Sequence, residues 1–315
     1  MMLARVAESL YWTGRYLERA ENVARLLLVT SELAVEMEGI DDKLAQREWD
    51  SLVAALPGAD RSRLDYSPAS GLAVPYVHSL LLDTDNPVSV LRSIDRTREN
   101  VRAVREALSV EVFLSLNTTY NELQRRTRRA LVDPADAIEI VRSAHARILS
   151  IVGAMDHTLS RDEGWNFLKL GEAMERVVRT ALVLHAKLPN LMTEDIDLPL
   201  VYARWRTLLR GQASLEAFRR AHGAGLEPKE VINFLYFNPA APRSLRCGLE
   251  RMKNYLDRLP AATEFTAPER IVGALLAETQ YGDEVISRDP HLFLGRVVGE
   301  LGEAHETLIK QYFEA

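Results

Sequence analysis

The chain has 315 residues, 47% of them hydrophobic, and a formal net charge of -6 at neutral pH. A chain of this length and composition can bury a sizeable core, which excludes a largely disordered protein. Its mildly acidic balance argues against general binding to nucleic acid or to an anionic membrane. The single cysteine, Cys247, excludes an intramolecular disulfide and a cysteine-rich zinc site, and it fits a reducing, cytoplasmic location.

The beginning of the chain and its longest apolar runs indicate neither export nor membrane insertion. Arg5 and Glu8 interrupt the first twelve residues, where an export signal would need an unbroken apolar stretch. No run approaches the roughly 18 apolar residues that a membrane-spanning helix requires. We therefore expect a soluble protein.

Apolar residues recur three and four positions apart along nearly the whole chain, whereas the alternating pattern of strands is hard to find. This periodicity predicts an all-α fold, a single multi-helix bundle of about 12–13 helices in one domain that spans residues 1–315. In chain order, we expect helices at about 3–37, 44–56, 72–83, 87–108, 111–131, 134–160, 163–188, 198–211, 214–222, 228–237, 243–259, 268–281 and 290–313.

Prolines mark many of these boundaries. Proline fits the first turn of a helix because its missing N–H would have no partner there, and it cannot continue a helix from within. The predicted starts are Asn86-Pro87, Asp133-Pro134 and Glu227-Pro228, and the predicted ends are Pro57-Gly58, Pro189-Asn190 and Pro260. We expect loops near 58–70 and 189–198.

Two distant segments share one pattern. The first long helix carries an apolar seam that alternates three- and four-residue steps. A second seam follows about 157 residues later, and this shift aligns Gly14, Glu18 and Arg19 with Gly171, Glu175 and Arg176. The shared Gly-x-x-x-Glu-Arg pattern predicts an internal duplication of a long helix, with copies near 3–37 and 163–188.

The two glycines predict a close approach between helices. Glycine inside a helix is about 1 kcal/mol less favourable than alanine, so Gly14 and Gly171 indicate that another backbone passes near each of them. Each glycine precedes its glutamate by one turn, which places a small recess beside a carboxylate. The predicted acidic site consists of Glu18, Glu21, Glu172 and Glu175. It would hold a cation or an amine; alternatively, these carboxylates are partly buried and paired with arginines of neighbouring helices.

Basic residues supply candidates for binding an anion or a substrate. Arg98, Arg102 and Arg105 form a stripe along one predicted helix, which would meet phosphate or carboxylate groups or balance nearby glutamates. Arg243 and Ser244 precede a predicted helix whose free N–H groups could receive an anion; the alternative is an ordinary proline-rich beginning of a helix. The complete set of basic and hydroxyl candidates is Arg15, Arg19, Arg98, Arg102, Arg105, Arg176, Arg243 and Ser244.

No short catalytic motif accompanies these residues. The sequence has no phosphate loop, dinucleotide fingerprint, serine elbow or zinc-protease helix. No Glu-x-x-His pair of the di-iron bundle type supports the acidic site either, and we expect neither a metal nor another cofactor. The catalytic residues therefore stay unassigned, although paired carboxylates on helices can perform acid–base chemistry without such a motif.

The segment from Arg5 to Arg25, RVAESLYWTGRYLERAENVAR, closely resembles the opening helix of the bacterial alpha-E domain family. Further segments that resemble the family are Asn86-Pro87 with Ser89, Arg98 to Arg102, Arg161 to Trp165, Gly171 with Glu175-Arg176, and Asn238-Pro239 with Pro242-Arg243-Ser244. The resemblance spans nearly the whole chain. It implies a helical bacterial protein encoded beside, or fused to, a circularly permuted ATP-grasp ligase, often with a transglutaminase-like protease nearby.

Three hypotheses about function follow. In the first, the chain is a non-catalytic partner that docks on the ligase and presents a peptide or carboxylate substrate. In the second, it is an enzyme that uses paired glutamates on an amide, amine or peptide. In the third, it is a purely structural homo-oligomer.

Overall fold

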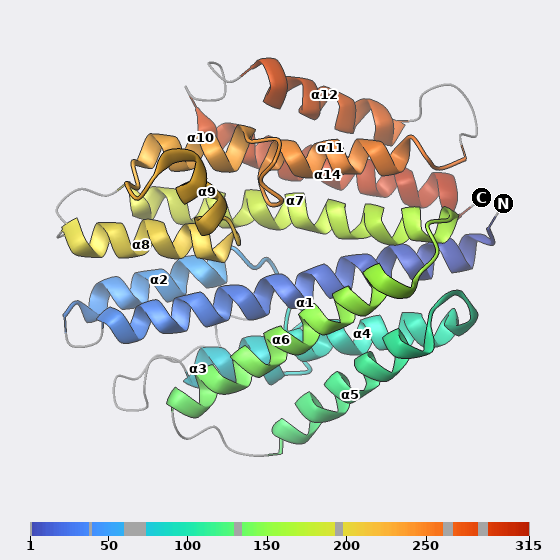
Figure 1. The fold of residues 1–315 in the computed structure, drawn as a ribbon, viewed down its shortest axis with the longest axis horizontal. Coiled ribbons are helices and arrows are strands. Elements are labelled where there is room, and N and C mark those ends of the chain that lie inside the picture. Colours follow the sequence, from blue (N-terminus) through green and yellow to red (C-terminus); the bar gives the residue numbers. More distant parts are fainter. Residues whose placement is uncertain are drawn as a thin grey trace. The chain divides into compact units, whose positions relative to one another are not determined.

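The protein is all-helical throughout the part of the chain that its computed structural model describes, and no strand occurs there (Figure 1). The described residues are 2–37, 40–59, 74–128, 134–192, 198–260, 267–282 and 289–314. The α-helices are α1 (Ala4–Met37), α2 (Asp42–Ala54), α3 (Val74–Val77), α4 (Val90–Ala103), α5 (Val110–Arg126), α6 (Pro134–Thr158), α7 (Glu163–Leu191), α8 (Leu198–Gly211), α9 (Leu215–His222), α10 (Pro228–Phe237), α11 (Leu245–Leu256), α12 (Ala267–Tyr281) and α14 (Pro290–Tyr312). The predicted all-α fold is confirmed. In these ranges, no helix combines the length and apolar character needed to cross a bilayer.

The chain divides into two compact units. The terminal unit comprises Met1–Arg15, Ser160–His185 and Leu208–Ala315, and the central unit comprises Tyr16–Leu159 and Ala186–Thr207. Helices α1, α7 and α8 each contribute residues to both units. The expectation of one domain over the whole chain stays a prediction, and so does the internal duplication.

In the terminal unit, α12 packs against both α11 and α14, and α10 contacts α9, α11 and α12 (Figure 1). Their amphipathic faces supply a core in which Phe218, Leu235, Met252 and Val297 are fully buried. Burying such large apolar side chains is the main favourable contribution to the folding of this unit.

In the central unit, α5 packs against both α4 and α6. Trp49 of α2 stacks on Tyr76 of α3, with 4.4 Å between the ring centroids. A smaller apolar cluster joins the end of α1 to the beginning of α2 through Leu33, Met37 and Leu44. These contacts gather segments far apart in sequence around one apolar interior.

Several helices begin where the prolines predict, and one does not. Helices α6 and α10 begin at Pro134 and Pro228, as predicted. Helix α4 begins at Val90 and not at Pro87, because the Ser89 hydroxyl caps it by accepting a hydrogen bond from the Arg92 amide. Serine is a preferred N-cap because its oxygen satisfies an amide that lacks a helical partner.

Some predicted helix ends are wrong. Helix α4 ends at Ala103, and Arg105 lies in a separate 3-10 turn, so the stripe Arg98–Arg102–Arg105 does not lie on one continuous helix. Helix α5 ends at Arg126, before the predicted end at 131. Conversely, α7 continues through Pro189 to Leu191. A proline removes a single hydrogen-bond donor, and this loss is tolerated near the end of a long packed helix.

The predicted segment 72–83 is not one regular α-helix. After the short α3, the chain continues as a π-helical segment over His78–Leu82. Most of the predicted loop 58–70 lies outside the described residues, as do residues 193–197 of the loop predicted at 189–198. The end predicted at 131 also falls outside them.

Both glycines of the shared pattern lie at a close helix contact in the terminal unit. A Cβ on Gly14 would overlap the Leu168 carbonyl and lie 2.8 Å from the Glu172 amide nitrogen. A Cβ on Gly171 would overlap the Tyr11 carbonyl and lie 3.3 Å from the Arg15 amide nitrogen. The contact between α1 and α7 is therefore reciprocal, and the predicted close approach of another backbone is confirmed at each glycine.

We expect Gly14→Ala to destabilise the protein by about 3 kcal/mol or more, because the new methyl group meets main-chain atoms that cannot rotate away. The matched control is Gly153→Ala in α6, where a Cβ has nothing within 4 Å. Alanine should stabilise that helix by up to about 1 kcal/mol. Urea denaturation of both variants tests this contrast, and equal small effects would contradict the close packing.

Candidate functional site

A buried ion cluster lies beside the glycine contact in the terminal unit. The Arg15 Nε donates to Glu175 Oε2 at 2.6 Å, and the Arg179 Nε donates to Glu175 Oε1 at 2.8 Å. The Arg15 guanidinium also donates to the Tyr11 hydroxyl at 2.9 Å, and this hydroxyl is 2.8 Å from His305 Nδ1. Glu175 is only 1% exposed, so two guanidinium groups neutralise its carboxylate away from solvent.

This cluster keeps Arg15 charged. Burial alone would lower the pKa of Arg15, but the neighbouring Tyr11 and Glu175 outweigh burial and raise that pKa above its ordinary value. Tyr11 and His305 were not predicted as site residues. Tyr11 lies four residues before Arg15 on the same helix face, a spacing from which the pair could have been inferred.

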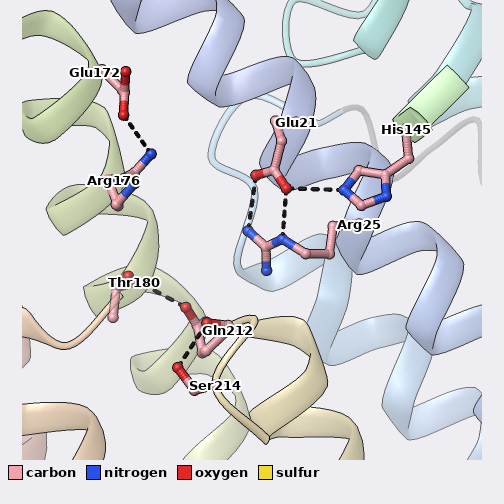
Figure 2. A network of polar contacts seen from close by, with 8 residues as sticks. All are labelled: Glu21, Arg25, His145, Glu172, Arg176, Thr180, Gln212 and Ser214. Atoms are coloured by element: carbon pink, nitrogen blue, oxygen red, sulfur yellow. Dashed lines mark hydrogen bonds and ion pairs between the residues drawn. The ribbon is translucent and has the colours of Figure 1, made fainter. Parts of the chain in front are cut away.

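A second ion cluster follows one face of α7. The Lys169 Nζ and an Arg176 guanidinium nitrogen each donate to Glu172, both at 2.6 Å; Figure 2 shows the Arg176 contact. Burial would raise the pKa of Glu172, but the charges of Arg176, Lys169 and Arg243 hold it at about 2. This carboxylate is ionised at neutral pH.

The same face of α7 continues, one turn further, to Thr180. Its hydroxyl donates to Gln212 Oε1 at 3.3 Å and lies 3.4 Å from the Arg243 carbonyl oxygen. Ser214 in turn donates to the Gln212 carbonyl, as Figure 2 shows. The Gln212 side chain is fully buried, and its Nε2 has no hydrogen-bond partner in the part of the chain that the structure describes.

The central unit contains a third cluster. Arg25 donates to both carboxylate oxygens of Glu21, at 2.9 and 3.2 Å, and His145 Nε2 lies 3.0 Å from Glu21 Oε1 (Figure 2). Asn22, the next residue of α1, is 0% exposed, and neither the nitrogen nor the oxygen of its side-chain amide has a hydrogen-bond partner within the described ranges. A buried amide of this kind costs free energy.

A fourth ion cluster, the second in the central unit, was not predicted. Glu48 of α2 accepts from Lys187 Nζ at 2.9 Å and from Arg204 Nε at 2.6 Å. Burial would raise the pKa of Glu48, but the charges of Lys187 and Arg204 lower it below its ordinary value. Glu48 lies one turn from both Leu44 and Leu52 on the buried face of α2. A charged residue within an apolar stripe could have indicated a buried ion pair from the sequence.

The four predicted acidic residues divide between the units. Glu172 and Glu175 lie in the terminal unit, and Glu18 and Glu21 lie in the central unit, where Glu18 is buried. Their convergence on one cation or amine stays a prediction. Within the described ranges, no three histidine, cysteine or acidic side chains gather closely enough to hold a metal ion.

The predicted basic residues differ in exposure. Arg98 is half-buried; its Nε donates to Asn117 at 2.6 Å, and its guanidinium lies 4.6 Å from the Tyr120 ring centroid. Arg102 and Arg105 are exposed, and Arg105 lies 4.7 Å from the Phe113 ring centroid. These two exposed cations are accessible to a ligand or a partner.

The other three basic or hydroxyl candidates contact the chain itself. Arg19 lies 5.2 Å from the Tyr16 ring centroid. The Ser244 hydroxyl caps α11 by accepting from the Cys247 amide at 3.1 Å, and it donates to the Asn238 carbonyl. Arg243 is buried beside this cap. This Ser244 cap has the geometry of an ordinary beginning of a helix, which was the alternative to an anion site at Arg243 and Ser244.

These features define an all-helical domain with several buried Glu–Arg contacts. The model of the Alpha-E family, a predicted alpha-helical domain with a conserved ER motif, matches residues 2–313. The chain belongs to this family.

Two of its curated relatives are uncharacterised mycobacterial proteins. The one from Mycobacterium bovis is 30% identical over 284 residues, which cover 85% of this chain and 31% of that protein. The one from Mycobacterium tuberculosis strain H37Rv is 29% identical over the same shares. The chain thus spans about a third of the length of these relatives. No solved structure matches it.

We expect Glu175→Gln to cost about 3–5 kcal/mol of unfolding free energy, because it leaves Arg15 and Arg179 buried without their shared counter-charge. Glu99→Gln is the control, since Glu99 pairs with Arg96 on the surface and should matter by less than about 1 kcal/mol. Chemical denaturation measures both changes. A cost at Glu175 no larger than at Glu99 would show that the buried cluster does not stabilise the fold.

Acid should weaken the protein through Glu172. Its folded pKa of about 2 lies below the unfolded value of about 4.3, so the unfolded state binds more protons between them. The stabilisation is complete above about pH 5 and is lost as the pH falls toward 2. The urea midpoint of the native protein should therefore approach that of Glu172→Gln on acidification. A difference that stays constant with pH would contradict this assignment.

Proposed function

We propose that this Alpha-E chain is a non-catalytic module of a peptide- or amide-forming system, which docks on a circularly permuted ATP-grasp ligase and presents a substrate to it. The ligase and a transglutaminase-like protease are the partners that the family resemblance implies. Support for a modular role comes from the relatives, in which the matched region is about a third of a longer polypeptide. A domain of this kind works beside other parts of a system.

The non-catalytic role rests on the pairing of the buried or partly buried carboxylates. Glu21, Glu172 and Glu175 each contact at least one guanidinium group of the chain itself. A general acid or base works best when its pKa lies near the operating pH, and the pKa of Glu172 is held far below it. These contacts favour a structural role for the paired glutamates over the alternative of catalysis.

The docking surface that we propose is the exposed part of the basic stripe. Arg102 and Arg105 are exposed where α4 ends, and Val110 and Leu114 of α5 are 62% and 59% exposed one helical turn apart. Arg105 lies 4.7 Å from the Phe113 ring centroid, so a cation meets an apolar side chain here, which suits a partner surface that offers acidic residues around an apolar centre. The acidic character of this chain as a whole makes such a local basic surface selective.

Co-expression with the ligase tests the proposal, and the complex should persist through size-exclusion chromatography with its mass measured by light scattering. Arg102→Glu should weaken the association at least tenfold, because it places a like charge opposite the acidic partner surface. Arg220→Glu is the matched control, since it makes the same charge change at an exposed position of α9. It should leave the association within about twofold.

Two outcomes would overturn the proposal. One is a chain that never associates with the ligase, including a chain that forms only a homo-oligomer. The other is turnover of a peptide or amide by the isolated protein that Glu175→Gln abolishes in a folded variant, which would establish the enzyme alternative.

A further inference from the structure

A groove lies between α5 and α6 of the central unit, and none of its lining residues belongs to the ion clusters described above. It is small: its cavity volume is about 10 Å³, enough for about one water molecule, and the wider empty space of about 250 Å³ includes open solvent. Its lining residues are Glu122, Leu123, Arg126, Ile140, Ser143, Ala144 and Arg147. Three of these, Leu123, Ile140 and Ala144, are apolar and at most 9% exposed, and the other four carry polar groups.

The charges in the groove are unequal. Arg147 pairs with Glu122 at 2.6 Å, which is the only carboxylate among the lining residues. Arg126 makes no hydrogen bond or ion pair with any residue that the structure describes. The groove therefore contains two guanidinium groups, and among the described residues only that of Arg147 has a carboxylate partner.

Further donors line the same groove. The Arg147 Nε is shielded from solvent and has no hydrogen-bond partner among the described residues, although another nitrogen of this guanidinium pairs with Glu122. Ser143 is partly buried and contributes a hydroxyl. A shielded donor without an acceptor costs free energy, and an oxygen of a bound anion would remove that cost.

We infer that this groove binds the carboxylate group of a peptide or of an N-acylated amino acid. The planar guanidinium of Arg126 matches a carboxylate with two parallel hydrogen bonds, and Ser143 and the Arg147 Nε supply further donors. Leu123, Ile140 and Ala144 are almost entirely buried, so the polar side chains are the ones that would contact the ligand. Glu122 disfavours a phosphate, whose second negative charge it would repel.

This inference rests on the proposed function, to which it adds the place and the chemistry of substrate binding. A module that presents a peptide substrate must bind the peptide at a part that does not react. A groove that binds one end of a peptide through its carboxylate would leave the rest of the peptide free to reach the ligase.

The test is an NMR titration of the full chain with N-acetyl-L-alanine, read from the side-chain Nε–H signals of the arginines. Saturable shifts at Arg126 and Arg147 are expected. N-acetyl-L-alanine N-methylamide, which lacks the carboxylate, should produce none, and inorganic phosphate should bind more weakly than the acetylated amino acid. Arg126→Gln should weaken binding at least tenfold, which corresponds to about 1.4 kcal/mol.

Arg125→Gln is the matched control, because Arg125 precedes Arg126 in the chain but is exposed and donates to the Asn121 carbonyl outside the groove. Its binding should change less than about twofold, as expected for a distant exposed charge. Four results would overturn the inference: no saturable shift, equal binding of the methylamide, tighter binding of phosphate, or equal effects of the two substitutions. Circular dichroism of each variant verifies that it is folded.

The two proposals fail separately. A chain that associates with the ligase but does not bind N-acetyl-L-alanine would remove only the carboxylate groove. A chain that binds the acetylated amino acid at Arg126 but never associates with the ligase would remove only the docking role.

Discussion

The close packing of α1 against α7 at Gly14 and Gly171 is the constraint on which the terminal unit depends. Gly14 of α1 and Gly171 of α7 each face main-chain atoms of the other helix, with no room for a side chain between them. Backbones this close bring neighbouring side chains into direct contact, so Arg15, which follows Gly14 in α1, reaches Glu175, one turn after Gly171 in α7. The glycines cost helical stability, and the packing and the ion cluster that they allow offset that cost.

The buried carboxylates show how charge is accommodated inside a helical protein. The buried Glu175 and Glu48 each contact two cationic side chains, and so does Glu172, which is only partly buried. Burial alone would favour the neutral form of each acid, but the nearby cations reverse this preference at Glu172 and Glu48. Such clusters add little net stability compared with apolar packing, yet removing one partner is costly. They consequently favour one arrangement of helices over others.

The groups available to other molecules differ in character from these interior clusters. The interior cations are engaged by carboxylates, whereas Arg102, Arg105 and Arg126 lie at or near the surface of the central unit. Binding by an Alpha-E domain is best sought at these accessible cations. In the curated relatives, the matched region is 31% of a longer polypeptide.

The sequence alone determined the helical class and many boundaries, because these depend on interactions within a few residues. The apolar period and the prolines predicted α8 and α10 to the residue, and glycine at positions 14 and 171 predicted the close helix contact. Only the tertiary structure decided that α7 continues through Pro189, because packing outweighs the loss of one hydrogen bond. It likewise decided that Glu48 meets Lys187 and Arg204, since local rules do not reach across 139 and 156 residues. The groove depends in the same way on how two helices pack.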